Sequence, residues 1–349
     1  MTISKTKRSI FWLLILLVAS AVIIRNNQKN QEEQQTYQTA KGIVFGTIYK
    51  VTYKYDRPLT EEITAELKRF DYSLSTFNKK SILSKINTNQ SNVLDSLCSK
   101  VFRRSIQIAK QTDGAFDITV APLVNAWGFG FKKQYELSQQ KIDSLKQYIG
   151  SDKIHVIGDS ILIKDNPNIM LDCSAVAKGY ACDVIGDVLL NHGVKDFMVD
   201  IGGELSLKGH GPTTENWRIG INKPVDDSLS VNNEDLSMII AITDVGVATS
   251  GNYRNFYYKG GKKYAHTIDP RTGYPVQHSL LSATVIAEDC LTADATATAF
   301  MVMGLDESKQ YLQQHSDIKA CLIYADKEGA LKQFISPDIK SKVSQIKND

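Results

Sequence analysis

Pairs of short β-prone runs joined by glycine-containing turns constrain the fold of this chain more than any other sequence feature. In each pair, two runs rich in branched and aromatic residues flank a short turn. The turns are centred on Gly158-Asp159, Gly202-Gly203, Gly260-Gly261 and Lys327-Glu328-Gly329. Glycine adopts the positive φ angles of tight hairpin turns without steric cost, and hairpins join antiparallel strands. Because such hairpins outnumber strand–helix–strand units, the sequence predicts an α+β fold: mixed and antiparallel sheets with flanking helices in a single large unit.

Helices and further strands are expected around these hairpins. Apolar periodicity with capping and stop signals predicts helices over 60–74, 94–112, 138–149 and about 175–191. A β-branched segment over 42–55, interrupted by Gly46, indicates one strand or a bulged pair of strands. Other strands are expected over 169–172, 217–221, 238–243 and 280–287. The hydroxyl-rich segment 247–254 is expected to be a turn that opens the hairpin across Gly260-Gly261.

The N-terminal 25 residues carry the pattern of an export signal. Lys5, Lys7 and Arg8 precede an uninterrupted apolar run over 10–24. We expect residues 1–25 to be an uncleaved anchor in the cytoplasmic membrane, with the folded part on the extracytoplasmic (periplasmic) side. Polar residues 26–40 are expected to form a tether, 41–340 the folded domain, and 341–349 a polar tail.

Composition and missing motifs exclude several classes of protein. The net charge is only +3 and the basic residues are scattered, so nucleic acid is not an expected partner. Five cysteines without a C-x-x-C pair indicate buried apolar residues rather than a zinc site or a disulfide framework. The chain has no Walker A motif, no G-x-G-x-x-G after a strand, no G-x-S-x-G and no H-E-x-x-H.

An alanine-rich segment from Leu291 to Gly304 predicts a helix that ends at Gly304. Thr292 is expected to be its N-cap, which would put Asp294 in the first turn. Asp294 and Thr298 are four residues apart and share one helix face, with about 6 Å between their Cβ atoms. A carboxylate and a hydroxyl at the positive end of a helix suit a hard cation such as Mg²⁺. An isolated pair of this kind is more often structural, so its interpretation depends on the neighbouring motifs.

Two other clusters could bind a ligand. Ala115, Phe116 and Asp117 offer a flat apolar face beside an acceptor, which suits an aromatic heterocycle, although a buried Phe and a capping Asp are the commoner arrangement. Small residues after Asp172 leave room for a phosphate at a helix N-terminus, where Lys178 could face an anion. A tightly packed corner with a surface lysine is an equally good interpretation of that second cluster.

His266 lies just before a strong turn signal at Asp269-Pro270-Arg271-Thr272-Gly273. Functional residues often occur where a strand ends beside such a turn. A single histidine is nevertheless more often structural than catalytic. The other histidines of the chain have no comparable context.

Taken in order along the chain, these clusters resemble the ApbE family, the FAD:protein FMN transferases. The resemblance extends from about Gly42 to Ile335. It rests on Gly46-Thr47-Ile48-Tyr49, Leu74-Ser75-Thr76-Phe77, 113–122, 172–181, Ser250-Gly251-Asn252-Tyr253, 266–273 and 294–298. The resemblance departs from the usual family pattern at Phe45, where Met is common, and at Asn252, where Asp is common. A lipid-bearing cysteine common in the family is also missing.

The resemblance implies an exported enzyme that uses Mg²⁺ and transfers FMN from FAD to a Ser or Thr hydroxyl of an exported protein, releasing AMP. Such acceptors include subunits of Rnf-type or sodium-pumping NADH–quinone reductase complexes. By the same resemblance, Asp294, Thr298 and the Ala175 carbonyl would hold the metal, and His266 would assist proton removal. The FAD pocket would draw on Phe45, Phe77, Ala115, Phe116, Asp117, Asp172, Lys178 and Ile268.

Two alternatives remain open at this point. A Mg²⁺-dependent FAD pyrophosphatase would use water in place of the acceptor hydroxyl and give FMN and AMP. A membrane-tethered flavin-binding protein would carry out no reaction, although Asp294, Thr298 and His266 together favour an enzyme.

Overall fold

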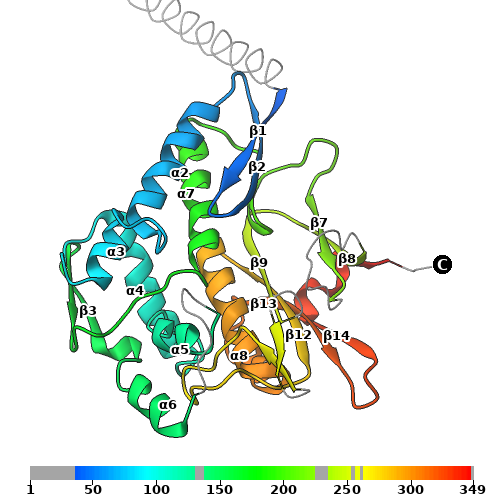
Figure 1. Cartoon of the computed structure of the whole chain (residues 1–349). Helices are drawn as coiled ribbons and strands as arrows, with labels where there is room; N and C mark the ends of the chain where they lie inside the picture. Colours follow the sequence, from blue (N-terminus) through cyan, green and yellow to red (C-terminus); the bar gives the residue numbers. More distant parts are fainter. Residues whose placement is uncertain (1–35, 130–136, 225–234, 253–255, 260–261, 347–349) are drawn as a thin grey trace, which may run out of the picture.

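The computed structural model describes residues 36–129, 137–224, 235–252, 256–259 and 262–346. Its main element is an eight-stranded sheet with the strand order β1-β2-β5-β6-β9-β12-β13-β14, in which all neighbours are antiparallel (Figure 1). These strands are β1 (Thr36–Val44), β2 (Thr47–Tyr55), β5 (Phe197–Ile201), β6 (Glu204–Lys208), β9 (Val245–Gly251), β12 (Leu280–Ala287), β13 (Lys319–Ala325) and β14 (Leu331–Ile335). The predicted fold class, α+β with antiparallel sheets and helices, is confirmed.

A small sheet and two separate hairpins complete the β structure. The small sheet has the order β15-β8-β7, with β15 at Val343–Gln345, β8 at Leu236–Ile242 and β7 at Trp217–Asn222. The hairpins are β3 (Ile154–Ile157) with β4 (Ile161–Lys164), and β10 (Phe256–Lys259) with β11 (Lys262–Ala265). All four hairpins expected from the glycine-containing turns are therefore present.

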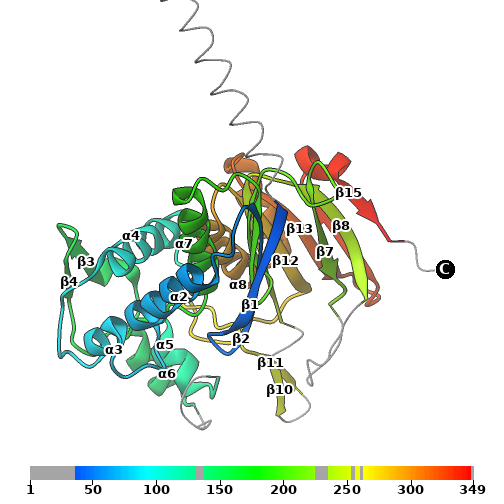
Figure 2. The ribbon, with the colours of Figure 1, turned by 90° about the horizontal axis from the view of Figure 1, so that it is seen from above.

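Helices cover one face of the main sheet and the small sheet covers the other, which gives three layers (Figure 2). The helices are α2 (Thr60–Leu74), α3 (Ile82–Asn87), α4 (Ser96–Gln111), α5 (Ala121–Ala126), α6 (Gln139–Lys146), α7 (Ala177–Asn191) and α8 (Cys290–Gln314). Short 3-10 helices lie at Ser151–Lys153 and Pro337–Lys342. None of the helices within the described ranges is long and apolar enough to cross a membrane.

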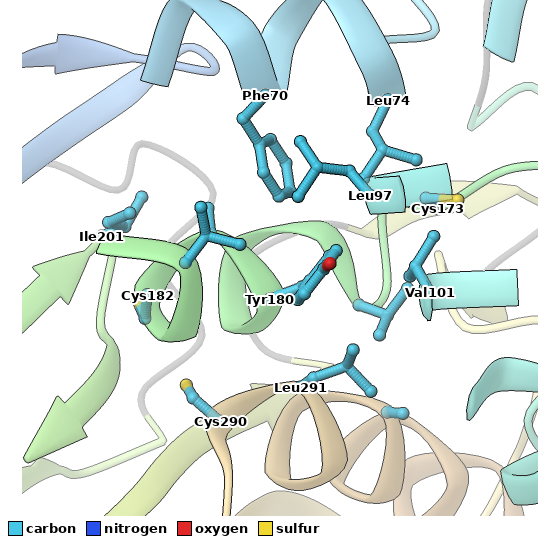
Figure 3. Packing of buried hydrophobic residues seen from close by; sticks show 14 of the residues in the cluster. Phe70, Leu74, Leu97, Val101, Cys173, Tyr180, Cys182, Ile201, Cys290 and Leu291 are labelled. Carbon is cyan, nitrogen blue, oxygen red and sulfur yellow. The ribbon is translucent and has the colours of Figure 1, made fainter. Parts of the chain in front are cut away.

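Helices α7 and α8 pack directly on the main sheet, and α2 and α4 pack outside them. Phe70 and Leu74 of α2 meet Tyr180 of α7 and Leu97 of α4 in one buried cluster (Figure 3). Ala residues of α8 lie against Ala248 and other small residues of β9 and β12. Small side chains on both surfaces let α8 approach the sheet closely. All five cysteines are buried and unpaired, as their spacing suggested.

The two ends of the domain extend further than predicted. Strand β1 begins at Thr36, so residues 36–40 belong to the sheet and not to a tether. Phe45 and Gly46 both have positive φ, at 52° and 74°, and form the two-residue turn between β1 and β2. At the other end, Val343–Gln345 pairs with β8 although it lies in the predicted tail.

Two other predicted elements are wrong. Residues 169–172 form no strand, because the backbone N–H and C=O of Leu171 bond to the side chain of Asn87, each at 2.8 Å, rather than to a neighbouring strand. Residues 247–254 were expected to be a turn, but 247–251 lie in β9 (Val245–Gly251) in the middle of the main sheet, and 253–254 lie outside the described residues.

The N-terminus of α8 also differs from the prediction. Asp289, not Thr292, is the N-cap, and its side chain accepts a hydrogen bond from the backbone N–H of Thr292 at 2.7 Å. Asp294 therefore lies beyond the first turn. Gly304 breaks the helical geometry with a φ of 77°, as its predicted role as a stop requires, and a second helical stretch continues to Gln314.

Candidate functional site

A cavity of about 770 Å³ lies where α7 and α8 meet the main sheet. Its wall is formed by residues 115–118, the start of α7, the turn between β5 and β6, the end of β9, residues 266–268 and the inner face of α8. Every site residue predicted from the sequence lines this cavity except Phe45. The cavity thus brings together motifs that are up to 220 residues apart, and its volume falls in the range of cofactor sites, about 300–1,000 Å³.

Asp294 is held in place by the backbone of α7. Its Oδ2 accepts a hydrogen bond from the N–H of Gly179 at 2.9 Å. Gly179 lies in the first turn of α7, where backbone N–H groups have no partner within the helix, and the first helical bond runs from the N–H of Tyr180 to the carbonyl of Val176 at 3.0 Å. Asp294 satisfies the Gly179 N–H through Oδ2, and both Asp294 and Ala175, which precedes the helix, line the cavity.

The contact is close because residue 179 is a glycine. A Cβ at this position would lie 2.3 Å from the carbonyl oxygen of Cys290 and 2.6 Å from the Cβ of Asp294. The start of α8 is fixed from the same side, because the Asp183 carboxylate accepts hydrogen bonds from the N–H groups of Cys290 and Leu291, at 2.9 and 2.8 Å. Cys182 of α7 and Cys290 of α8 lie between the helices (Figure 3).

A buried charge cluster lies beside Asp294. Lys178 Nζ forms an ion pair with Glu204 Oε1, and the Glu204 side chain is only 4% exposed. The pKa of Glu204 is raised to about 7, because burial and the negative charge of Asp294 outweigh the opposing effect of Lys178. Burial also raises the pKa of Asp294, while Lys178 and the Gly179 N–H oppose this shift. Burial alone lowers the pKa of Lys178, but the two carboxylates outweigh it and leave that pKa raised.

Glu204 is the residue that the sequence analysis missed. Its Oε2 is buried without a hydrogen-bond partner among the described residues. The available signal was a carboxylate directly after Gly202-Gly203, at the start of a strand in which Leu205 and Leu207 alternate with polar residues, but a hairpin turn explains the same pattern. Only the pairing of β6 beside β5 places that carboxylate under α7.

The arrangement fits a divalent cation held by few protein ligands. When both buried carboxyls are ionised, they and the one lysine carry a net negative charge, and Glu204 has an oxygen without a partner among the described residues. Asp294, Thr298 and Ala175 all line the same cavity. No group of three or more His, Cys, Asp or Glu side chains that could hold a metal occurs among the described residues. The predicted metal ligands are the Asp294 carboxylate and two neutral oxygens, from Thr298 and Ala175, so they do not form a cluster of that kind.

His266 also lines the cavity, on the wall that follows β11. Its ring lies edge-on to Phe129, with the ring centroids 6.5 Å apart. The turn after it is rigid because Arg271 bonds Asp269 at 3.0 Å and Glu307 of α8 at 2.7 Å. These bonds therefore fix the position of His266, which directly follows β11, relative to α8.

The remaining predicted ligand-binding residues have distinct environments. Phe116 and Ala115 are buried wall residues, and Ile268 is buried against α5 and α6. The carboxylate of Asp117 accepts four hydrogen bonds from Thr119 and Ser151, at 2.6–2.8 Å. Asp117 thus shapes the cavity wall. Its contacts are those of a capping Asp, the alternative given for this residue in the sequence analysis.

Asp172 and the two other aromatic residues complete the set. Asp172 Oδ1 accepts hydrogen bonds from the N–H and hydroxyl of Ser174, at 2.8 and 2.5 Å. Phe77 lies at the cavity with 79% of its surface exposed. Phe45 is not among the lining residues, because its ring packs against Phe70 with the centroids 5.4 Å apart.

The fold and the site define an α+β protein with a cofactor-sized cavity, built around a carboxylate that two helices hold in place. Comparisons with known proteins identify the family. The chain belongs to the ApbE family, whose sequence profile matches residues 45–322.

Curated relatives and solved structures agree with this assignment. The FAD:protein FMN transferase of Escherichia coli is 35% identical over 322 residues, which cover 88% of this chain and 90% of the relative. The FAD:protein FMN transferase of Vibrio cholerae is 34% identical over 315 residues, covering 87% and 92%. The solved flavin transferase ApbE from Vibrio cholerae matches with a TM-score of 0.77 and 32% identity, covering 88% of this chain and 99% of that one. The apo flavinyl transferase ApbE from Pseudomonas stutzeri matches with a TM-score of 0.77 and 30% identity, covering 88% and 97%.

Proposed function

We propose that this protein transfers FMN from FAD to a Ser or Thr hydroxyl of an exported target protein and releases AMP. The acceptor oxygen bonds to the phosphorus on the FMN side of the FAD pyrophosphate, and the bond from that phosphorus to the AMP oxygen breaks. The hydroxyl proton passes to a base, and the product is a phosphoester. Family membership and relatives that carry the name FAD:protein FMN transferase support this proposal.

The observation that carries the proposal is the hydrogen bond that Gly179 donates to Asp294. It fixes Asp294 through Oδ2, so that Oδ1 could hold Mg²⁺ together with the Ala175 carbonyl and the Thr298 hydroxyl, which line the same cavity. When bound there, Mg²⁺ would stabilise the negative charge that develops on phosphoryl oxygens. Three protein ligands suit this cation because it usually keeps positions for water and phosphate.

Lys178 and His266 have separate roles in this proposal. Lys178, near the N-terminus of α7, donates to a phosphate oxygen, and the helix end adds partial positive charge. His266 accepts the proton of the acceptor hydroxyl, a reaction that suits imidazole near neutral pH. Phe77, Phe116 and Ile268 provide apolar surface for the flavin and adenine rings.

The location of the reaction is also proposed. The basic and apolar pattern of residues 1–25 supports a membrane anchor with the domain on the periplasmic side. The protein substrates would then be exported flavin-bearing proteins, such as subunits of Rnf-type or sodium-pumping NADH–quinone reductase complexes.

The test combines the full-length chain with FAD, Mg²⁺ and an exported acceptor domain that carries a candidate Thr. Intact-protein mass spectrometry follows the acceptor while AMP release is measured. A mass gain of one FMN with matching AMP is expected. AMP and free FMN without labelling, over several acceptors, would indicate the pyrophosphatase, and FAD binding without either product would indicate a binding protein.

Two variants test the assigned residues. Asp294→Ala is expected to abolish the Mg²⁺-dependent reaction, whereas Asp306→Ala, an exposed position on the same helix, leaves it unchanged. Full activity in Asp294→Ala would contradict the metal assignment. His266→Ala is expected to keep FAD affinity and to slow transfer by about 10²–10⁴-fold. Loss of FAD binding without a separate effect on rate would make His266 a pocket residue instead.

A further inference from the structure

Three large hydrophobic side chains are far more exposed than the others in the described part of the chain. They are Ile43 at 83%, Phe77 at 79% and Ile48 at 69%, and the next is Val93 at 55%. Leaving an isoleucine in water forgoes the burial energy that drives folding. Exposed apolar residues that lie together are typical of a surface that contacts a partner.

Ile43 and Ile48 are directly opposite each other on β1 and β2, and Lys41 and Lys50 are the next opposite pair on the same face. Both lysines are exposed. Like charges at directly opposite positions are unfavourable within a hairpin. Lysines are common on edge strands, and β1 is the edge of the main sheet, but the two isoleucines have no such explanation. We call these four residues the hairpin patch.

The hairpin patch adjoins the cavity. The carbonyl of Ile48 accepts a hydrogen bond from the N–H of Gly202 at 3.0 Å, and Gly202 lines the cavity. Thr47 touches the same turn, since a Cβ on Gly202 would lie 2.9 Å from its side chain. The patch therefore lies next to the turn at Gly202-Gly203, which lines the cavity and directly precedes Glu204.

The hairpin is held rigidly at this place. Phe45, in its turn, packs against Phe70 of α2, and α2 leads directly to Phe77 at the cavity. Phe45 therefore has a structural reason to lie outside the cavity. It fixes an exposed apolar surface next to the turn at Gly202-Gly203, which lines the cavity.

We propose that the hairpin patch is the docking surface for the protein that accepts FMN, an inference that depends on the function proposed above. A hydroxyl on a folded protein must enter the cavity from solvent, so the acceptor covers the residues beside the opening. The chemistry of the patch selects a segment with an apolar side chain between the two isoleucines and with carboxylates facing Lys41 and Lys50. Complementary charge of this type increases the association rate.

The test compares full-length variants on the acceptor domain that the wild type labels. Ile43→Ser with Ile48→Ser removes the apolar part, and Lys41→Glu with Lys50→Glu reverses the charge. The matched control is Ile157→Ser with Ile163→Ser, two isoleucines that are 53% and 47% exposed on the β3–β4 hairpin, which contributes no residue to the cavity wall.

Both patch variants are expected to raise the KM for the acceptor domain about tenfold, the effect typical of losing contact residues, while kcat stays within about twofold. FAD affinity, measured by flavin fluorescence, and the melting temperature are expected to match the wild type. Added salt should weaken acceptor binding to the wild type but not to the charge-reversed variant.

An unchanged KM, or an equal rise in the control variant, would overturn the inference. A parallel loss of FAD affinity would also overturn it, because the patch would then act through the cavity. A shift from dimer to monomer in the patch variants, seen by light scattering, would identify the patch as an interface between copies of this chain. If the wild type labels no acceptor, the proposed function fails instead, so the two failures are distinguishable.

Discussion

Replacing Gly179 with alanine tests whether the contact between α7 and α8 sets the geometry of the site. The new Cβ would lie 2.3 Å from the carbonyl oxygen of Cys290, and ordinary contact begins at 3.4 Å. The neighbouring atoms belong mainly to the backbone of α8, so the helices must separate by about 1 Å. Overpacking of this size costs about 1–3 kcal/mol, and the better helix propensity of alanine offsets about 1 kcal/mol of that.

The expected result is a small loss of stability and a large loss of activity. The free energy of unfolding, measured by denaturant titration, should fall by about 0–2 kcal/mol. FMN transfer should fall by about 10²-fold, because a displacement of about 1 Å moves Asp294 away from the cation it would hold. The affinity for Mg²⁺, measured by calorimetry with FAD present, should fall in parallel.

The matched control is Gly186→Ala in the same helix. The atoms nearest to its Cβ would be side-chain atoms of Phe197 and Ser206, at 3.3 Å, and these can adjust. Gly186→Ala is expected to keep wild-type transfer activity. If Gly179→Ala were also as active as the wild type, the close contact between the helices would not be what holds Asp294, and the reasoning would be refuted.

Two further predictions concern stability. Lys178→Met removes the cation that pairs with Glu204, and we expect a loss on the order of 2 kcal/mol at pH 8.5, less than for a fully buried pair because 32% of the Lys178 side chain is exposed. With Lys178 in place, burial and Asp294 raise the pKa of Glu204 to about 7, and removing Lys178 raises it further. The carboxyl is therefore protonated at pH 5.5 in both proteins, and the cost should largely disappear there. Urea titrations at the two pH values check this, and a loss that is equal or larger at pH 5.5 would contradict it. Gly304→Ala places a side chain at a φ of 77° and 3.0 Å from His278, and should lower the free energy of unfolding by about 1–3 kcal/mol, whereas an unchanged urea midpoint would show that α8 does not need its break.

The sequence predicted those parts of the site that depend on local pattern. The spacing of Asp294 and Thr298, the helix after Asp172 and the hairpin at Gly202-Gly203 are each encoded within about ten residues, and all are present. The predicted N-cap of α8 was wrong because Asp and Thr are both residue types that favour this position. Asp289 and Thr292 are three positions apart, and local preference does not choose between them.

What the sequence did not predict depends on contacts between distant segments. The ion pair of Glu204 with Lys178 requires β6 to lie beneath α7, and nothing near Glu204 specifies that partner. The backbone of Leu171 bonds to the side chain of Asn87, 84 residues earlier in the sequence, and not to a neighbouring strand. The position of Phe45 outside the cavity likewise follows from packing on α2 and not from its own segment.

The order of strands in the main sheet has a consequence for folding. β2 and β5 are neighbours, yet all of 56–196, including α2 to α7, lies between them in sequence. Closing so long a segment is slow, and strands β9 and β12 join from still later parts of the chain. Residues 115–118 and α8 therefore form one wall only after nearly the whole chain has been synthesised and has folded. Flavin binding should then be linked to global rather than local unfolding, so that FAD raises the melting temperature of the entire domain in one transition.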